Sequence, residues 1–423
     1  MFVFNPAHRD PRVQREASYL AAAGHEVRVY AFWDAALPAS EQRDGYQILR
    51  FDQRPEWRRT VDEHLLKPFK RKKKAVDMQA PPRLEPPPLR PATRPCQPPQ
   101  RWLPAESSPE ERKHRQYVRR INRIWARQAE SWQPDVCHAH DLDTLEAAAW
   151  AARACGAALI YDSHEIWPEQ QFIRSQEEAD YWYALERSLI GEARAVITVN
   201  DSIVEHFRQR YQHPRVLRLY NTPRLQPIPE VTPLRVSRGK PVALFQGGYF
   251  HERGLEELIV SATLQSRVHV ALRGMGAYEA SLQALAQEVG APVEFLPPAP
   301  ADRLVEALAE ADISLIPYPP TCMNNYLATP NKLFESLMAG VPIAGADVPE
   351  LHRLLEQYPV GALFDPQSPE DIARCLVELS DAPLGQMAQS CRQLAEQQYH
   401  WEREATALGD LYRELAQGQP SRP

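Results

Sequence analysis

The sequence predicts an α/β protein in which two doubly wound parallel-sheet domains follow one another along the chain. First, a chain of 423 residues is longer than usually folds around a single hydrophobic core, so two domains are expected. Second, short apolar strands alternate with amphipathic helices in two separate series, which is the pattern of parallel sheets covered by helices on both faces. Third, a proline-rich segment over residues 221–233 lies between the two series.

These observations predict four segments of the chain. We expect a first Rossmann-like domain over residues 1–222, a linker over 223–240, a second domain over 241–385 and C-terminal helices over 386–423. Ligands of doubly wound folds bind beyond the carboxyl ends of the strands, so we expect a site in a cleft between the two domains.

The first series opens with MFVF, which predicts a short strand. Asp10 is the expected N-cap of a helix that has Pro11 at its first position and ends near Gly24. Further strands are expected over residues 25–32, 46–51, 135–140, 157–165, 193–200 and 215–220, with helices around 110–131, over 142–156 and from Asp201.

The second series begins with PVALFQGG, residues 241–248. Its other expected strands cover residues 267–274, 292–296, 311–318 and 341–346, with helices between them.

A basic, proline-rich insertion is expected at about residues 55–110. Residues 54–120 hold 18 Lys and Arg against 8 Asp and Glu, although the whole chain has a formal charge of −6. Proline at this density prevents both helix and sheet, so the segment is expected to be irregular. Three interpretations stay open: a solvated loop, contact of residues 54–120 with anionic membrane lipid, and nuclear targeting by the run KRKKK.

The remaining bulk properties favour a cytoplasmic protein. No stretch of about eighteen apolar residues occurs, and the apolar opening is too short for a signal peptide. The six cysteines are scattered without C-x-x-C spacing, as is typical of reduced thiols. Because the net charge is negative, nucleic acid is not an expected partner. A peripheral place at the inner face of the cell membrane would follow if the basic segment binds lipid.

The segment TPNKLFESLMAGVPIAGADVPE, residues 329–350, is the richest in functional signals. It predicts a helix from about Asn331 to Ala339 that is ended by Gly340. The free N–H groups at a helix N-terminus form a seat for phosphate, and Lys332 would add positive charge there. Glu335 lies one turn in, where it can accept hydrogen bonds from sugar hydroxyls. The alternative is an amphipathic helix on which Lys332 and Glu335 are simply solvated.

Two histidines and several acids gather at the ends of strands in the first series. His138 and His140 share one face of a strand, Asp141 and Asp143 follow, and His164 with Glu165 end the next strand. This grouping suggests a rival function, a metal-dependent hydrolase that uses His138, His140 and Asp141. Against it, the later strand ends ITVN and RLYN bring no further ligands. No metal is therefore the working assumption.

Several segments resemble, in the right order, the retaining GT-B glycosyltransferases of the large group 1 family that acts on nucleotide sugars. PNKLFESLMAGVPI resembles the donor-site signature of that family. DPRVQREASYLAAAGHEVRVYA, DVCHAHDLDTL, YDSHEIWPE, ERSLIGEARAVITVNDSI, FQGGYFHERGLEELI and QQYHWEREATALGDLY resemble other parts of it. The resemblance covers nearly the whole chain outside the basic insertion.

The resemblance implies a glycosyltransferase that moves a sugar from a nucleotide-sugar donor to a hydroxyl of a carbohydrate or lipid-linked acceptor. The resemblance also implies that the transfer retains the anomeric configuration and serves polysaccharide or glycoconjugate synthesis. It further implies that the enzyme uses no metal or other cofactor. It also implies that residues 1–222 form the acceptor side, residues 241–385 bind the nucleotide sugar, and the last helix returns to the first domain.

The resemblance further implies roles for individual residues. Glu335 would bind the nucleotide ribose, and His140 with Asp141 would face the reacting sugar as the catalytic pair. His164 and Glu165 would line the acceptor side. The remaining donor-binding residues would surround the diphosphate: Gly247, Gly248, Arg253, Arg273, Asn331 and Lys332.

Two departures from the family pattern stand out. Leu327 occupies the position, eight before Glu335, where the family usually has a glutamate that touches the transferred sugar; Asn324, Asn325 or Tyr326 are the candidate substitutes. The family also has a basic residue near the glycine pair, and Arg273 is the expected replacement. The missing glutamate leaves open a third class of function, a catalytically silent GT-B partner protein.

Overall fold

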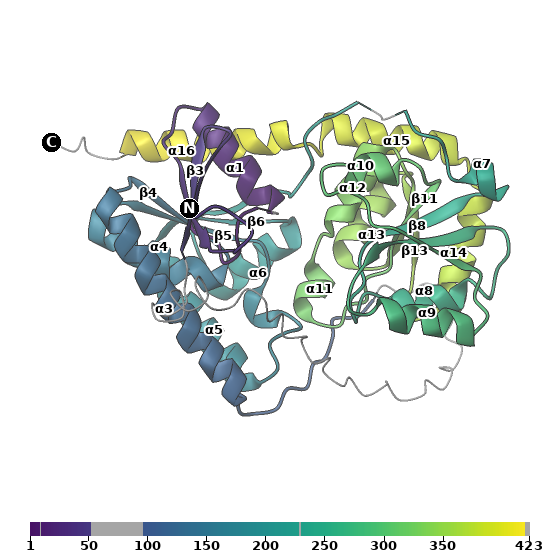
Figure 1. Cartoon of the computed structure of the whole chain (residues 1–423), viewed down its shortest axis with the longest axis horizontal. Helices are drawn as coiled ribbons and strands as arrows, with labels where there is room; N and C mark the ends of the chain where they lie inside the picture. The colour runs from purple at the N-terminus through teal and green to yellow at the C-terminus, as the bar shows by residue number, and fades with distance from the viewer. Residues whose placement is uncertain (9, 52–95, 228–229, 419–423) are drawn as a thin grey trace.

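A computed structural model describes residues 1–8, 10–51, 96–227 and 230–418. It shows two α/β domains, each built on its own sheet, with the C-terminal helices running along both (Figure 1). Residues 52–95 lie outside the described residues, and they include most of the basic insertion predicted at about residues 55–110. Within the described ranges, no helix is both long and apolar enough to cross a lipid bilayer.

The first domain is built on two groups of strands joined through the start of the chain. Strands β1, β3 and β2 form one group, and β4, β5, β6 and β7 form the other. Phe2 bridges them, because it pairs with Tyr30 on one side and Ala139 on the other. The strands are β1 Arg28–Phe32, β2 Ser40–Arg43, β3 Tyr46–Phe51, β4 Val136–His140, β5 Ala158–Ser163, β6 Ala193–Thr198 and β7 Val216–Arg218.

Helices cover the first sheet and begin where the sequence places capping residues. The Asp10 side chain accepts from the N–H of Val13 at the start of α1, and Ser108 with Glu111 forms a capping box at the start of α3. The helices are α1 Pro11–Ala22, α3 Pro109–Trp132, α4 Leu142–Cys155, α5 Gln176–Leu189 and α6 Asp201–Tyr211, with short 3₁₀ turns over Trp167–Glu169 and Ile190–Glu192.

The second domain is an all-parallel six-stranded sheet in the order β10-β9-β8-β11-β12-β13. Its strands are β8 Val242–Gly248, β9 His269–Met275, β10 Val293–Leu296, β11 Ile313–Ile316, β12 Ile343–Ala346 and β13 Gly361–Phe364. The helices of this half are α7 Arg235–Arg238, α8 Leu255–Ser261, α9 Glu279–Glu288, α10 Leu304–Leu308, α11 Met323–Leu327, α12 Asn331–Ala339, α13 Pro349–Gln357, α14 Pro369–Asp381, α15 Leu384–Gln397 and α16 Trp401–Gly418.

Three local features differ from the sequence prediction. The opening strand is reduced to the bridges of Phe2. Strand β2 pairs antiparallel with β3 through a tight turn, where Asp44 and Gly45 have φ of 43° and 86°. An Asp-Gly pair is a strong hairpin signal that the α/β alternation hid. Strand β13 was also missed, because its four residues carry little periodicity.

The strand order reverses at one point in each sheet. In the second sheet β8 lies between β9 and β11, and in the first sheet the Phe2 segment lies between β1 and β4. Because connections leave toward opposite faces at such a switch point, a crevice opens beyond the carboxyl end of the strand there. The loops that follow Phe2 and β8 are therefore the places where a ligand is expected.

The last helix belongs to the core of the first domain. Helix α16, drawn in yellow, runs back along the first domain beside α1 (Figure 1). It buries Trp401, Leu408, Leu411 and Tyr412 in a cluster with residues of α1, β1 and β6. The chain thus crosses between the domains near residue 221 and again before α16, and both connections hold the domains together.

Trp401 provides a test of this second connection. Its side chain is 2% exposed, and the guanidinium of Arg15 lies 5.6 Å from its ring. We expect Trp401→Ala to lower the free energy of unfolding by about 3–5 kcal/mol, since it removes a large buried side chain. Urea denaturation would measure the change. Arg413→Ala, on the exposed face of the same helix, is the control and should change stability by about 0.5 kcal/mol or less. Equal effects of the two variants would show that α16 is not part of the first core.

Candidate active site

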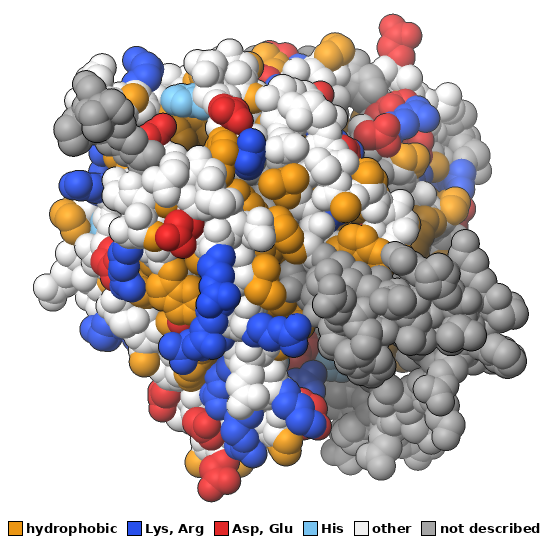
Figure 2. Space-filling view, turned by 60° about the vertical axis from the view of Figure 1, so that its left-hand side comes forward, with side chains coloured by type: hydrophobic (Ala, Val, Ile, Leu, Met, Phe, Trp, Pro, Cys, Tyr) orange, Lys and Arg blue, Asp and Glu red, His pale blue; other side chains and the backbone are white. Residues whose placement is uncertain are grey.

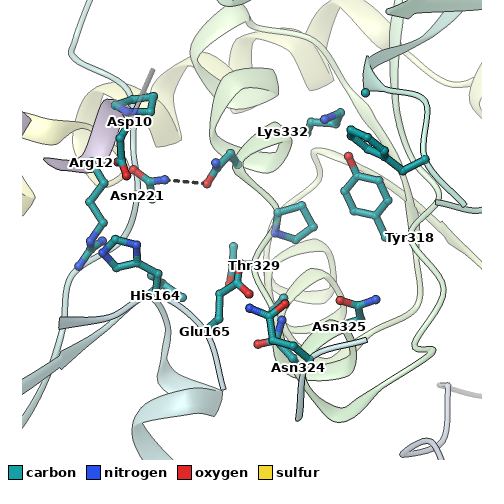
Figure 3. A pocket seen from close by; sticks show the side chains of 18 of the residues that line it. Asp10, Arg12, His164, Glu165, Asn221, Tyr318, Asn324, Asn325, Thr329 and Lys332 are labelled. Atoms are coloured by element: carbon teal, nitrogen blue, oxygen red, sulfur yellow. Dashed lines mark hydrogen bonds between the residues drawn. The ribbon is translucent and has the colours of Figure 1, made fainter. Parts of the chain in front are cut away.

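A cleft of about 920 Å³ lies between the two domains and is lined by both (Figure 3). This volume is within the usual range for small-molecule sites. The loops at both switch points contribute to it, as the chain order predicts. Lining residues from the first domain include Asn5, Asp10, Arg12, His164, Glu165 and Asn221; those from the second include Gly248, Arg253, Tyr318, Asn324, Thr329, Asn331 and Lys332.

The N-terminus of α12 faces this cleft. The helix covers Asn331–Ala339 and is ended by Gly340 at φ 67°, as the sequence predicts. No side chain caps its start, so its first N–H groups remain directed toward the cleft, where Pro330 and Asn331 form part of the lining. A helix end of this kind attracts an anion.

Two cations reach the same part of the cleft from different elements. The Nζ of Lys332 lies 5.4 Å from the centre of the Tyr318 ring, and the guanidinium of Arg253 lies 4.8 Å from it. Lys332 extends over the glycine pair at the end of β8: a Cβ on Gly247 would lie 2.7 Å from its Nζ. The backbone of this glycine pair and the two cations therefore surround one small volume, which suits a diphosphate.

Gly254 determines where Arg253 lies. Its φ is 68°, and a Cβ at this position would come within 2.0 Å of the carbonyl oxygen of Pro317. Only glycine lets α8 begin this close to the end of β11. The close approach places Arg253 beside Tyr318, the residue that directly follows Pro317.

Arg273 does not lie at the glycine pair, which is the place expected for it from the sequence. Its side chain is 9% exposed, forms an ion pair with Glu310 and donates to the carbonyl oxygen of Ala307. It does not line the cleft. The arginine points from β9 toward the segment around α10, because strand alternation directs it to the covered face of the sheet. Lys332 instead supplies the positive charge at the glycine pair.

Glu335 lies one turn after Lys332 on α12 and is half-buried. Glu335 is not among the residues that line the cleft. Burial raises the pKa of its carboxyl, while the positive charges of Lys332 and Arg15 oppose that rise. Glu335 is thus held near two cations at the edge of the cleft, on the side of α1.

A polar chain joins the domains beside the start of α12. Arg15 of α1 donates to the side-chain oxygen of Asn221, and the Asn221 amide donates to the side-chain oxygen of Asn331 at 3.0 Å (Figure 3). Asn221 lies in the segment that follows β7, the last strand of the first domain. The chain therefore couples the interdomain connection to the helix N-terminus.

The first domain contributes an imidazolium to the cleft. His164 Nδ1 lies 3.2 Å from Asp141 Oδ2, and its Nε2 lies 3.3 Å from Asp162 Oδ2. Burial lowers the pKa of His164, but the two carboxylates outweigh burial and raise the pKa to about 10. His164 is therefore protonated at neutral pH, and both its nitrogens face carboxylates. A general-base role for it is excluded by this arrangement.

Asp141 is held in an unusual backbone conformation that serves this contact. Its φ is 66°, which few residues other than glycine adopt. The N–H of Asp141 donates to the carbonyl oxygen of Asp162, and its Oδ1 accepts from the N–H of His164 at 2.9 Å. These bonds stabilise the strained residue, as is common at functional sites. Asp141 holds His164 and does not itself line the cleft.

His140 lies behind His164 and away from the cleft. The sequence analysis placed it at the reacting sugar, but it is only 1% exposed, and its Nδ1 lies 3.2 Å from His164 Nε2. Burial, with the neighbouring His138, lowers the pKa of His140 to about 3, so it is neutral. The physical reason is the face of β4: His138 and His140 both point under α1, whereas the loop after β5 carries His164 farther out.

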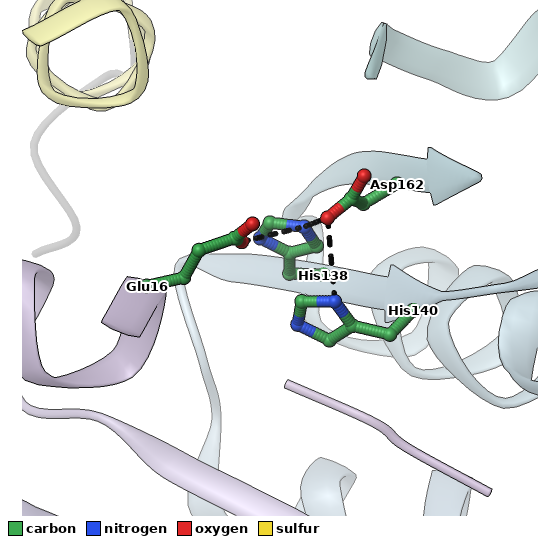
Figure 4. A group of neighbouring side chains, drawn as sticks. All are labelled: Glu16, His138, His140 and Asp162. Carbon is green, nitrogen blue, oxygen red and sulfur yellow. Dashed lines mark ion pairs between the residues drawn. The ribbon is translucent and has the colours of Figure 1, made fainter. Parts of the chain in front are cut away.

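Four buried side chains form the group that suggested a metal site (Figure 4). Glu16, His138, His140 and Asp162 have ligand atoms within 4.8 Å of one another. A cation already accompanies their carboxylates, because Arg12 donates to both oxygens of Asp162 at 2.7 and 2.8 Å and lies 3.1 Å from Glu16. None of the four lines the cleft. A hydrolytic metal needs an open position toward substrate, which this buried group does not present.

Arg12 and Asp162 are functional candidates that sequence reasoning missed. Arg12 lines the cleft, and its guanidinium pairs with Asp162. Burial alone would raise the pKa of Asp162, but the positive charge of Arg12 holds this pKa well below its usual range. The sequence does contain a signal for Arg12, because this arginine lies on the buried face of the first predicted helix. A buried guanidinium needs an acidic partner. Which acid it meets is decided by the sheet.

Glu165 and Asn324 meet where the two domains touch. The N–H of Ile166, next to Glu165, donates to Asn324 Oδ1 at 2.8 Å, and both Glu165 and Asn324 line the cleft. Asn200 donates to the carbonyl oxygen of Leu327 at 2.7 Å and to the Thr329 hydroxyl at 3.0 Å. These bonds hold the segment before α12 against the first domain.

Comparison with known proteins agrees with this arrangement. Residues 10–222 match the glycosyl transferase 4-like domain family, and residues 240–382 match the glycosyl transferases group 1 family. A comparison with curated proteins found no match.

The solved structures that resemble the chain share its two-domain architecture. Sucrose-phosphate synthase from Thermosynechococcus elongatus is 16% identical with a TM-score of 0.71, over 99% of this chain and 98% of that one. HepE from Anabaena, in complex with UDP and glucose, is 15% identical with a TM-score of 0.65, over 97% of this chain and 98% of that one. A glycosyltransferase from Rickettsia africae is 10% identical with a TM-score of 0.63, over 99% and 98%. At these identities the likeness shows the fold, which is GT-B.

One of the two family matches covers half of the chain, and the other covers most of the second domain. The two matches lie on the two sides of the cleft, and together they decide between the transferase and the hydrolase that the histidines suggested. The chain belongs to the group 1 glycosyltransferases and is a GT-B glycosyltransferase.

Proposed function

We propose that this glycosyltransferase moves a sugar from a nucleotide-sugar donor to a hydroxyl of a carbohydrate or lipid-linked acceptor, with retention of configuration. One observation carries the donor part of this proposal: Lys332, Arg253 and the start of α12 meet at the glycine pair after β8. Synthesis of a polysaccharide or glycoconjugate is the process that such a transfer would serve. HepE was solved with UDP-glucose, so a UDP-sugar is the first donor to test.

The proposed mechanism relies on electrostatics rather than on a covalent intermediate. As the bond to the sugar breaks, negative charge develops on the departing diphosphate, and Lys332, Arg253 and the α12 N-terminus stabilise it. These groups are already in place, so little reorganisation is needed. We assign no protein nucleophile and no general base, and a diphosphate oxygen takes the proton of the acceptor hydroxyl. NMR of the anomeric proton in the product would test retention, and an inverted product would refute it.

The first-domain side of the cleft places the imidazolium of His164 opposite the donor side. With both nitrogens held by Asp141 and Asp162, His164 acts as a fixed positive charge and a rigid surface. We assign it to the reacting sugar, in the role the sequence analysis gave to His140. Asp141 is then a positioning residue for His164.

The diphosphate assignment predicts the effect of removing the charge of Lys332. Lys332→Met keeps the length of the side chain, and we expect it to weaken binding of both UDP and inorganic pyrophosphate by about tenfold to a hundredfold, since a charged hydrogen bond is lost. Isothermal titration calorimetry with UDP, GDP, ADP and pyrophosphate would measure this. Lys240→Met, at the opposite end of β8, is the matched control. Undiminished pyrophosphate binding by Lys332→Met would place the diphosphate elsewhere.

The ribose assignment predicts a different pattern for Glu335. Glu335→Ala should lose most transferase activity through weaker donor binding, because the ribose hydroxyls lose their acceptor. Affinity for the nucleoside diphosphate should fall by about tenfold or more, while affinity for pyrophosphate should not fall. Glu356→Ala, exposed on α13, serves as the control. Normal donor binding and turnover by Glu335→Ala would refute the ribose role.

Peripheral contact with anionic membrane is a second proposal, and α3 supports it. The helix carries seven Lys and Arg against three Glu. Six of these basic side chains are exposed, on the face of the first domain where Lys and Arg gather in Figure 2: Arg112, Lys113, Arg119, Arg120, Arg123 and Arg127. A lipid-linked acceptor would be presented at such a surface. Each basic residue near an anionic bilayer contributes about 1 kcal/mol.

Vesicle sedimentation would test the membrane proposal. We expect binding to vesicles of phosphatidylglycerol and phosphatidylcholine that weakens with salt, and a loss of about tenfold or more in the Arg119→Glu/Arg123→Glu double variant. The control is Arg403→Glu/Arg413→Glu, with the same charge change on α16. Equal binding by both double variants would remove α3 from the contact.

A further inference from the structure

Among the described residues that line the cleft beside α12, the second domain offers no acid. Leu327 ends α11, and its side chain packs against the hydrophobic core of the first domain instead of lining the cleft. Its carbonyl oxygen is held by Asn200. Between Leu327 and α12, the residues that line the cleft are Ala328, Thr329 and Pro330, which offer one hydroxyl and no charge. Sugar hydroxyls bind most strongly to ionised acceptors, so the acid is expected from another element.

Among the described residues, four carboxylates line the cleft, and two of them accept hydrogen bonds from neighbouring residues of their own segments. Asp10 accepts from Asn5 and from the N–H of Val13, as the cap of α1. Asp34 accepts from the N–H of Ala36. Glu252 precedes Arg253 in the loop at the diphosphate end. The fourth is Glu165.

The backbone of Glu165 is fixed on both sides. The Ser163 hydroxyl donates to the carbonyl oxygen of Glu165 at 2.7 Å, and the N–H of Ile166 donates to Asn324 of the second domain at 2.8 Å. Ile166 itself is 1% exposed in the first-domain core. Glu165 thus reaches the second-domain wall from a rigid support and does not depend on a mobile loop.

One oxygen of the Glu165 carboxylate lacks a hydrogen-bond partner in the part of the chain that the structure describes. This oxygen is Oε2, and it is buried. In Figure 3 the side chain points into the cleft toward Thr329 and Asn324, away from the ring of His164. A buried polar atom without a partner is costly, and a ligand hydroxyl at this point would remove the cost.

We propose that Glu165 binds hydroxyl groups of the donor sugar from across the cleft, in place of the acid that Leu327 does not provide. This inference rests on the proposed nucleotide-sugar donor and moves Glu165 from the acceptor side, where the sequence placed it, to the donor side. The transferred sugar is then held between the domains, with its diphosphate on Lys332 and Arg253 and its hydroxyls on a first-domain acid. Glu165 would be a determinant of sugar specificity.

The protonation behaviour of Glu165 agrees with such a role. Burial raises the pKa of its carboxyl to about 7, Asp141 adds to the rise, and the positive charges of His164 and Arg253 oppose it. A hydroxyl that donates to the carboxylate would stabilise the ionised form and lower this pKa. Donor binding should therefore strengthen as the pH rises through 7.

Ligand pairs that differ only in the sugar would test the proposal. We would measure the affinities of the wild type and Glu165→Gln for UDP and UDP-glucose, GDP and GDP-mannose, and ADP and ADP-glucose, together with release of free sugar from each nucleotide sugar. Glu165→Gln keeps size and shape but removes the charge. We expect unchanged affinity for the nucleoside diphosphate, a loss of about tenfold to a hundredfold for the nucleotide sugar, and a similar loss in sugar release. Glu205→Gln, exposed on α6, is the matched control.

The outcomes separate this inference from the function on which it rests. If the wild type binds none of the nucleotides, the proposed donor class fails. If it binds and hydrolyses a nucleotide sugar but Glu165→Gln does so equally well, the donor-side role of Glu165 is refuted while the proposed function stands. If only transfer to an added acceptor is lost, Glu165 belongs to the acceptor side. Nucleotide sugars that lack single sugar hydroxyls would test the contact directly. For the analogue that lacks the contacted hydroxyl, the affinities of the wild type and of Glu165→Gln should differ by less than about twofold.

Discussion

The buried ion pair of Arg12 and Asp162 organises the first-domain side of the cleft. Arg12 extends from α1 and Asp162 from β5, and both oxygens of the carboxylate accept from the one guanidinium. Removing one partner of such a pair typically costs about 3–5 kcal/mol, because the other charge remains buried. The pair keeps Asp162 ionised, and ionised Asp162 with Asp141 keeps His164 protonated. One contact between a helix and a strand thus maintains the charge of His164 on the first-domain side of the cleft.

The two sides of the cleft have different electrostatic tasks. The second domain gathers Lys332, Arg253 and a helix N-terminus, which together suit a dianionic group. The first domain offers an imidazolium whose protons are already taken by carboxylates, and beside it an acid with an unsatisfied oxygen. This division agrees with a reaction in which the leaving group gains charge on one side while the sugar is oriented from the other.

Direct contacts hold these two sides together. Asn200 binds the segment before α12, Ile166 binds Asn324, and the N–H of Ser202 donates to Glu350 of α13 at 3.0 Å. Helix α16 adds a second covalent route between the domains and buries Tyr412 against His138, whose Nδ1 lies 2.9 Å from the tyrosine oxygen. The geometry of the cleft therefore depends on contacts far from it in sequence.

The sequence by itself determined the two βα series, most element boundaries and helix α12, whose start faces the cleft. Asp10, Pro11 and Gly340 mark helix ends by local chemistry, and hydrophobic periodicity marks most of the strands, so these features need no tertiary information. Resemblance added the family and the proposed roles of Lys332, Arg253 and Glu335. Short elements such as β2 and β13 escaped, because a few residues carry too little periodicity to compete with the dominant pattern.

Only the tertiary structure decided which charged residues meet. Arg273 and Lys332 are both basic, so the sequence alone does not show which of them reaches the glycine pair. In the structure Arg273 points from β9 toward Glu310, while α12 extends Lys332 over Gly247. His140 and His164 both lie at strand ends, yet β4 buries His140 under α1 and the loop after β5 brings His164 to the cleft. Burial and pairing depend on neighbours supplied by distant segments, and local sequence patterns do not contain those neighbours.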